Sequence, residues 1–132
     1  MSNTKGYIYI RTNNNWDKYN VCKLSHTDNL HKMDVQYAND SEFIRGRFVL
    51  VFEVYNIYIN HIKQRLPFHK YNIRRDGGHD FYDKKIITLI ESQLSKCGFP
   101  YKKLSEQEII NLVKGDIVES TNKIQEVFEE KS

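Results

Sequence analysis

The sequence predicts a small α+β domain in which a mixed or antiparallel three-stranded sheet is flanked by helices. Residues 6–10 alternate β-branched and aromatic side chains, and a second run of strand-forming residues follows after a polar turn. A near-continuous apolar run lies at residues 48–52. Between and after these runs lie segments with apolar residues at helical spacing, and we predict that these segments are helices.

Length and composition are those of one globular domain. The chain has 132 residues, of which 39% are hydrophobic and 28% charged, so a single core is expected. No apolar run reaches membrane-spanning length and the first residues do not form a signal peptide, so we expect no membrane contact. Cys22 and Cys97 form no metal-binding pattern. We expect reduced core thiols and an intracellular protein.

The first element is a predicted hairpin. Its strands cover residues 6–11 and 19–25, and residues 12–17 between them are rich in turn-forming types. Thr27 or Asp28 can cap the helix that follows. That helix is expected over residues 28–38, with Leu30, Met33 and Tyr37 on one apolar stripe.

A turn at residues 39–41 leads to the third strand, expected at residues 47–55. Its apolar run is typical of a central strand that is covered on both faces. A second helix is expected over about residues 57–66, where Pro67 ends it. Residues 76–78 form a predicted turn, and residues 79–82 are expected to enter a third helix that Asp83 caps and Gly98 ends.

The C-terminal part adds two predicted helices. Ser105 and Glu108 form a capping box for a helix that runs to Lys114, with Leu104 and Ile109 placed as a hydrophobic staple. The last helix carries Ile117, Thr121, Ile124 and Phe128 on one stripe at helical spacing. We therefore expect a domain at residues 1–100 and an extension at 101–132 that packs on it. A homodimer through the last helix is the alternative.

Charge is unevenly distributed along the chain. The net charge is +3, and one stretch without acidic residues concentrates positive charge: Lys63, Arg65, Lys70, Arg74 and Arg75. The tail after Gly115 is acidic instead. A basic stripe can bind a polyanion by releasing counterions, so nucleic acid, DNA first, is the expected partner. A solvated loop face is the alternative.

Two short motifs give a resemblance to a known family. Tyr7-Ile8-Tyr9 and Lys23-Leu24-Ser25 resemble the paired strand motifs of the GIY-YIG nuclease superfamily, in its phage and large-DNA-virus branch. The resemblance covers roughly residues 6–100. It implies a viral protein of the host cytoplasm or nucleus, and a phosphodiesterase that depends on Mg²⁺ or Mn²⁺.

The resemblance assigns roles to four residues near the hairpin. Tyr9 stands where a tyrosine helps to activate the attacking water, and we expect Tyr7 beside it on the opposite face of the strand. Lys23 fills the phosphate-contacting position of the second strand, and Ser25 replaces the motif glycine. His26 stands where a basic residue contacts a phosphate.

Two further positions depart from the family pattern. Met33 stands where the first helix should carry an arginine for the scissile phosphate, and a thioether cannot make charge-assisted bonds. Lys63 stands where the second helix should carry the metal-binding glutamate, and an ammonium cannot ligate a cation. We therefore expect a degenerate domain that binds nucleic acid without a metal cofactor and with lost or strongly reduced cleavage.

Two other functions stay open. An active endonuclease would need relocated groups, for which the carboxylates of Glu53, Asp76 and Asp80 and the guanidinium groups of Arg45 and Arg47 are candidates. It would require Mg²⁺ or Mn²⁺. A viral structural or interaction protein would instead reuse the fold as a scaffold, with its C-terminal helices as the contact surface.

Overall fold

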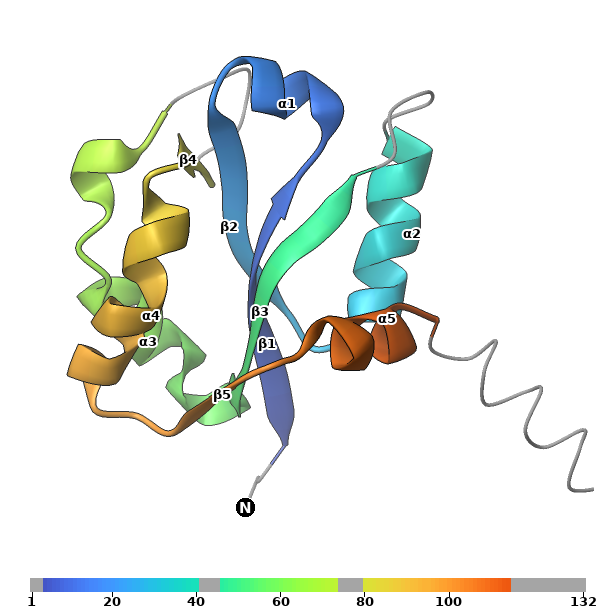
Figure 1. Ribbon diagram of the computed structural model, residues 1–132. Coiled ribbons are helices and arrows are strands. Elements are labelled where there is room, and N and C mark those ends of the chain that lie inside the picture. The colour runs from blue at the N-terminus through green and yellow to red at the C-terminus, as the bar shows by residue number, and fades with distance from the viewer. Residues whose placement is uncertain (1–3, 41–45, 74–79, 115–132) are drawn as a thin grey trace, which may run out of the picture.

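The protein has the predicted α+β architecture, with a five-stranded antiparallel sheet between two groups of helices (Figure 1). The computed structural model describes residues 4–40, 46–73 and 80–114. The strands are β1 (Lys5–Thr12), β2 (Val21–Thr27), β3 (Arg47–Tyr55), β4 (Phe81–Asp83) and β5 (Tyr101–Lys103). The α-helices are α1 (Asn14–Lys18), α2 (Leu30–Asp40), α3 (Ile59–Arg65), α4 (Ile86–Cys97) and α5 (Glu106–Lys114), and two 3₁₀ turns are η1 (Asn56–Tyr58) and η2 (His69–Tyr71).

The strand order is β4-β2-β1-β3-β5, which places β1 at the centre of the sheet. The predicted hairpin forms the β1–β2 pair, in which Tyr9 lies opposite Ser25. Its connection contains the short helix α1, which was not predicted. The Asn13 side chain caps this helix by accepting a hydrogen bond of 2.8 Å from the backbone N–H of Trp16.

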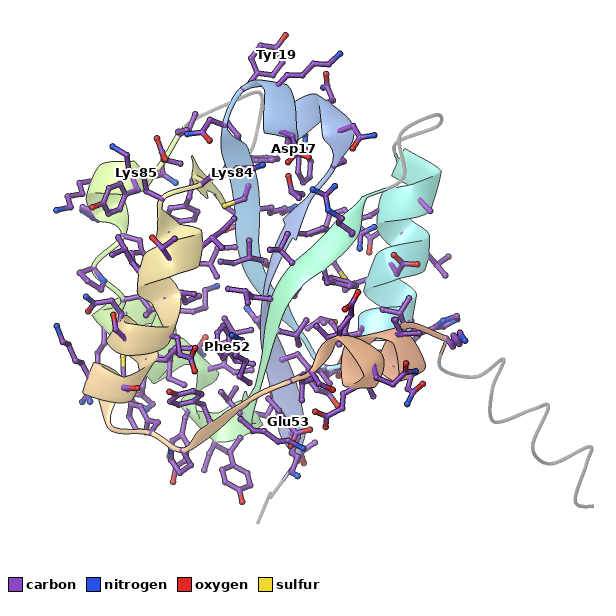
Figure 2. All side chains as sticks on the ribbon, viewed as in Figure 1. Asp17, Tyr19, Phe52, Glu53, Lys84 and Lys85 are labelled. Carbon is purple, nitrogen blue, oxygen red and sulfur yellow. The ribbon has the colours of Figure 1, made fainter. Side chains whose placement is uncertain are left out.

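Each face of the sheet is covered by different helices. Helices α3 and α4 lie on one face, and α2 and α5 lie on the other (Figure 1). Phe52 and Glu53, which are neighbours on β3, point to opposite faces, and Phe52 belongs to the core beneath α3 and α4 (Figure 2). The larger core includes Ile8, Ile10, Cys22, Phe52, Ile62, Ile90 and Leu94, and the smaller core consists of Tyr9, Leu30, Tyr37, Val51 and Leu104.

The apolar strand β3 is not the central strand that the sequence predicts. It pairs with β1 along its length, but β5 contacts it only between Phe52 and Val54. Val51 and Phe52 are fully buried, so the prediction that both faces are covered is confirmed for these residues. The apolar run therefore predicts that both faces of the strand are buried. It does not predict the position of the strand in the sheet.

Residues 81–83 form a strand, whereas the sequence predicts the approach to a helix. In β4, Tyr82 pairs with Cys22 of β2, and α4 begins only at Ile86. Phe81 and Tyr82 have high strand propensity, and the free edge of β2 supplies the backbone partners. The strand β5, which has three residues, was not predicted either.

Several helix ends agree with the predictions. Gly98 ends α4 with φ = 81°, a left-handed conformation that favours glycine. At the start of α5, the side-chain oxygens of Ser105 and Glu108 accept hydrogen bonds from each other's backbone N–H groups, at 3.2 and 3.0 Å. These bonds confirm the capping box. The turn at 76–78 and the last helix lie outside the described residues.

The smaller core also contains a buried ion pair. Nη2 of Arg11 lies 3.0 Å from Oδ1 of Asp34, and the Arg11 side chain is only 1% exposed. The guanidinium carbon lies 4.6 Å from the ring centroids of both Tyr37 and Phe48. A buried cation needs such partners because it has lost its hydration.

We consider membrane-spanning helices and cysteines in residues 4–40, 46–73 and 80–114. No helix in this part of the chain is long and apolar enough to cross a membrane. The side chains of Cys22 and Cys97 are buried, as predicted for core thiols, and both are free cysteines. Burial raises the pKa of the Cys22 thiol to about 12, so it stays protonated at neutral pH.

We predict that Gly46→Ala destabilises the protein by about 1–3 kcal/mol. A Cβ atom at this position would lie 2.7 Å from the backbone oxygen of Thr12 and 3.0 Å from Nε of Arg11. Neither atom can move without disturbing the strand or the buried ion pair. Urea denaturation of the variant and the original chain measures the difference in the free energy of unfolding.

Gly6→Ala is the matched control. There a Cβ atom would meet the side-chain ends of Ile59 and Asn56, at 2.7 and 2.9 Å, and such ends can rotate away. The loss should therefore be smaller than at Gly46. An equal or larger loss for Gly6→Ala would show that the backbone around Gly46 adjusts freely.

Candidate nucleic-acid interface

Tyr9 lies inside the protein rather than at an open site. Its side chain is 0% exposed, and its hydroxyl is 2.7 Å from the hydroxyl of Tyr37 on α2. Burial raises the pKa of Tyr9 above its ordinary value, although the hydrogen bonds with Tyr37 and Ser25 oppose this rise. The phenol is therefore neutral at physiological pH and is occupied by a structural hydrogen bond.

Tyr7 lies on the same face of β1 as Tyr9, so the prediction of opposite faces is wrong. Residues two apart in a strand point to the same side, because successive side chains alternate. Both tyrosines pack in or against the smaller core. Burial, followed by the charge of Glu53 on the neighbouring strand, raises the pKa of Tyr7.

Lys23 and Met33 complete the group on this face. Lys23 lies opposite Arg11 in the sheet, and its Nζ is 5.1 Å from the Tyr37 ring centroid and 5.7 Å from that of Phe81. These rings interact favourably with its positive charge. Met33 packs against the smaller core, which is the packing role that its place on the apolar stripe predicts.

His26 and Lys63 meet on the other side of the sheet. His26 lies opposite Ile8, whose side chain is in the larger core, and Nζ of Lys63 on α3 is 3.4 Å from Nδ1 of His26. Partial burial and the charge of Lys63 lower the pKa of His26, while Asp80 acts in the opposite direction. His26 is therefore a neutral acceptor for the Lys63 ammonium at neutral pH.

A hollow of about 180 Å³ adjoins this pair. Its polar side chains are those of Lys63, Gln64, His69, Asp80 and Tyr82, and we call these residues, together with His26, the Lys63 site. Asp80 is its carboxylate, and the other side chains can donate hydrogen bonds. The site is suited to a group that carries negative charge and several oxygen acceptors, such as a phosphate.

The remaining cations of the basic run have varied positions. Arg65 donates a hydrogen bond of 3.2 Å to the carbonyl oxygen of Cys97, and its guanidinium carbon is 5.0 Å from the Phe99 ring centroid. It therefore stabilises the C-terminal end of α4. Nζ of Lys70 is 5.1 Å from the ring centroid of Tyr71. Arg74 and Arg75 lie outside the described residues.

The structure thus divides the residues that the resemblance groups around one phosphate. Tyr7, Tyr9, Lys23 and Met33 lie on the face of α2, whereas His26 and Lys63 lie on the face of α3. The sequence does not identify Tyr37 as the partner of Tyr9. Its place on the apolar stripe of the predicted helix is the signal that indicates a contact with β1.

The residues at the expected metal position do not fit a divalent cation. Lys63 replaces the expected carboxylate with an ammonium, which repels a metal ion. Among the residues described in ranges 4–40, 46–73 and 80–114, no group of three or more His, Cys, Asp or Glu side chains could hold a metal ion. No chemical step is therefore assigned to a metal at this position.

Tyr9→Phe should lower stability by about 1–3 kcal/mol, because the buried Tyr37 hydroxyl loses its partner. Thermal or urea unfolding provides the measurement. Tyr37→Phe should have a similar effect, and the double variant should lose less than the sum of the two single losses. Full additivity would mean that the two hydroxyls do not interact.

Lys63→Met should raise the pKa of His26 towards its ordinary value of 6.5, because the nearby positive charge is removed. Partial burial remains, so the pKa should stay below that value. An NMR titration of the imidazole protons measures the change. Lys32→Met on the exposed surface of α2 is the control and should leave the titration unchanged, and an identical curve for Lys63→Met would contradict the observed contact.

Comparisons of the chain with protein-family models, curated proteins and solved structures returned no match. An inference about what this surface binds therefore rests on the side chains of the Lys63 site. Its main features are a lysine ammonium, two histidines and the Tyr82 hydroxyl beside a single carboxylate.

Proposed function

We propose that this protein binds nucleic acid, in the first place DNA, by contacting backbone phosphates at the Lys63 site. We further propose that it has lost phosphodiester cleavage or retains it only weakly. The contact between Lys63 and His26, at 3.4 Å, is the observation that carries this proposal. It puts a lysine cation and a protonatable ring where the family resemblance expects a metal ligand and a phosphate contact.

A phosphate can use both groups at once. The Lys63 ammonium has three donors, and its side chain is exposed, so it can turn from the imidazole towards an incoming anion. A phosphate beside His26 would favour the protonated ring, which supplies another donor. Phosphate contacts of this kind hold a nucleic acid in register without reading its sequence.

The position of Tyr9 supports the proposed loss of cleavage. A residue that activates water must reach the reacting phosphate, either directly or through one water molecule. Tyr9 is fully buried, bonded to Tyr37, and on the opposite face of the sheet from Lys63. Phosphoryl transfer depends on positioning and on stabilisation of negative charge, so the separation of these groups is unfavourable for hydrolysis.

One observation favours the alternative of an active endonuclease with relocated groups. Asp80 lines the hollow beside Lys63, and its negative charge raises the pKa values of both Tyr9 and His26. Its backbone oxygen accepts a hydrogen bond of 2.9 Å from Leu24. In that alternative, Asp80 would bind Mg²⁺ or Mn²⁺ and take the place of the missing glutamate.

We expect DNA affinity that falls steeply with salt, because binding releases counterions. Lys63→Ala should weaken binding severalfold for every sequence and reduce the slope of log affinity against log salt by about 1. Fluorescence anisotropy with labelled duplexes of unrelated sequence measures both quantities. Lys32→Ala removes the same charge from the opposite side of the molecule and should change them less.

Incubation of the same duplexes with Mg²⁺ or Mn²⁺ separates the two functions. Binding without nicking is the expected result. Nicking by the original chain that disappears in Asp80→Asn would establish the active endonuclease instead. Equal effects of Lys63→Ala and Lys32→Ala on binding would move the contact away from the Lys63 site.

A further inference from the structure

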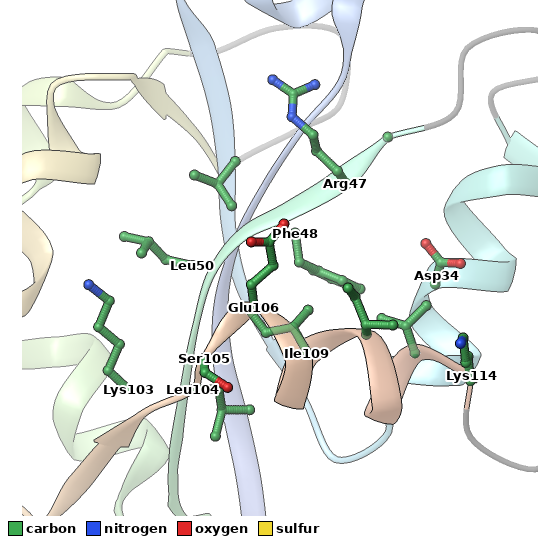
Figure 3. A pocket seen from close by; sticks show the side chains of 14 residues that line it. Asp34, Arg47, Phe48, Leu50, Lys103, Leu104, Ser105, Glu106, Ile109 and Lys114 are labelled. Atoms are coloured by element: carbon green, nitrogen blue, oxygen red, sulfur yellow. The ribbon is translucent and has the colours of Figure 1, made fainter. Parts of the chain in front are cut away.

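A large groove lies on the other side of the molecule from the Lys63 site. It has a volume of about 760 Å³ and lies between β3, α5 and the middle of α2 (Figure 3). We call it the α5 groove. Its apolar lining includes Phe48, Leu50, Leu104, Ile109, Ile110 and Val113. An apolar hollow of this size is typical of a surface that another segment covers.

Helix α5 has no buried residue, although four of its nine residues are aliphatic. Ile109 and Leu112 contact the smaller core, but Ile110 remains 39% exposed and faces the groove together with Val113. An amphipathic helix obtains most of its stability from burying its apolar face. In the described part of the chain, that burial is incomplete.

The edge of the sheet is also uncovered at this groove. Strand β5 pairs with β3 at Phe52, Glu53 and Val54, and no other described strand extends this pairing towards Arg47. Residues 46–50 instead line the groove. Proteins commonly cover such an edge with a helix or loop, since its unpaired backbone groups invite association with other chains.

We propose that the chain's own C-terminal segment, residues 115–132, packs into the α5 groove. The segment continues directly from Lys114, which is itself part of the groove lining. Its residues Ile117, Thr121, Ile124 and Phe128, three of which are large and apolar, have the spacing of one helix face. The groove offers the apolar surface that such a face needs.

Charge supports the same occupant. The segment contains five acidic residues against two lysines. The groove contributes Arg47, Lys103 and Lys114, with Asp34 and Glu106 as its carboxylates, and Asp34 is already paired with buried Arg11. Arg47 and Lys103 also have acidic neighbours, Asp17 and Glu91, so the electrostatic contribution adds to the apolar contact and does not replace it.

Amide hydrogen exchange of the full chain tests this packing. The variant with Ile124→Asp and Phe128→Asp should release the segment and speed exchange in residues 47–50 and in α5 by about tenfold or more. Exchange in β2 should not change. A control with Asn122→Asp and Gln125→Asp adds the same charge away from the apolar stripe and should exchange like the original chain.

A change on the groove side should give the same pattern. Ile110→Asp should also speed exchange in residues 47–50, whereas Val35→Asp, at an exposed apolar position of α2 outside the groove, should not. Unchanged exchange in both the tail and the Ile110 variants would overturn the proposal. Protection that weakens as the protein is diluted would assign the groove to a second copy of the chain, which also overturns it.

Discussion

The two-residue period of β1 is the constraint on which the rest of the structure depends. Ile8 and Ile10 point towards α3 and α4, while Tyr9 and Arg11 point towards α2. The central strand β1 therefore contributes side chains to both cores. In the neighbouring strands, residues that pair with β1 point to the same face as their partners. A side chain cannot change face without a change of register, so residues that are close in sequence can be separated by the thickness of the sheet.

This constraint explains both the buried polar groups and the exposed site. On the face of α2, the hydroxyl of Tyr9 is enclosed and hydrogen-bonded with Tyr37. The guanidinium of Arg11 is enclosed in an ion pair with Asp34, and its Nη1 and Nη2 atoms make no hydrogen bond within the described residues. Enclosed polar groups of this kind are costly to leave unpaired, which favours a fixed arrangement. On the other face, His26 lies beyond the part of β2 that pairs with β4, and both His26 and Lys63 remain exposed. The enclosed face thus stabilises the domain, and the accessible one is where we place binding.

Much of the fold could be predicted because local signals agreed with the global structure. The hairpin, the amphipathic stripe of α2, the capping box of Ser105 and the glycine that ends α4 all follow from side-chain chemistry within a few residues. The short strands β4 and β5 could not be predicted in this way, because three-residue strands depend on a neighbouring edge. The burial of Arg11 was also missed, since arginine is usually exposed and only its contacts with Asp34, Tyr37 and Phe48 make burial favourable. The resemblance suggested candidate site residues, but pairing across the sheet determines which of them meet.

Chemical-shift mapping of the full chain with a short DNA duplex at low salt tests the central claim most directly. If phosphates bind at the Lys63 site, the largest changes should occur at the His26 ring and at the backbone of Lys63 and His69, with the Tyr9 and Tyr37 face nearly unchanged. Changes centred on Lys23, Tyr37 and α2, or no change at any residue, would contradict it.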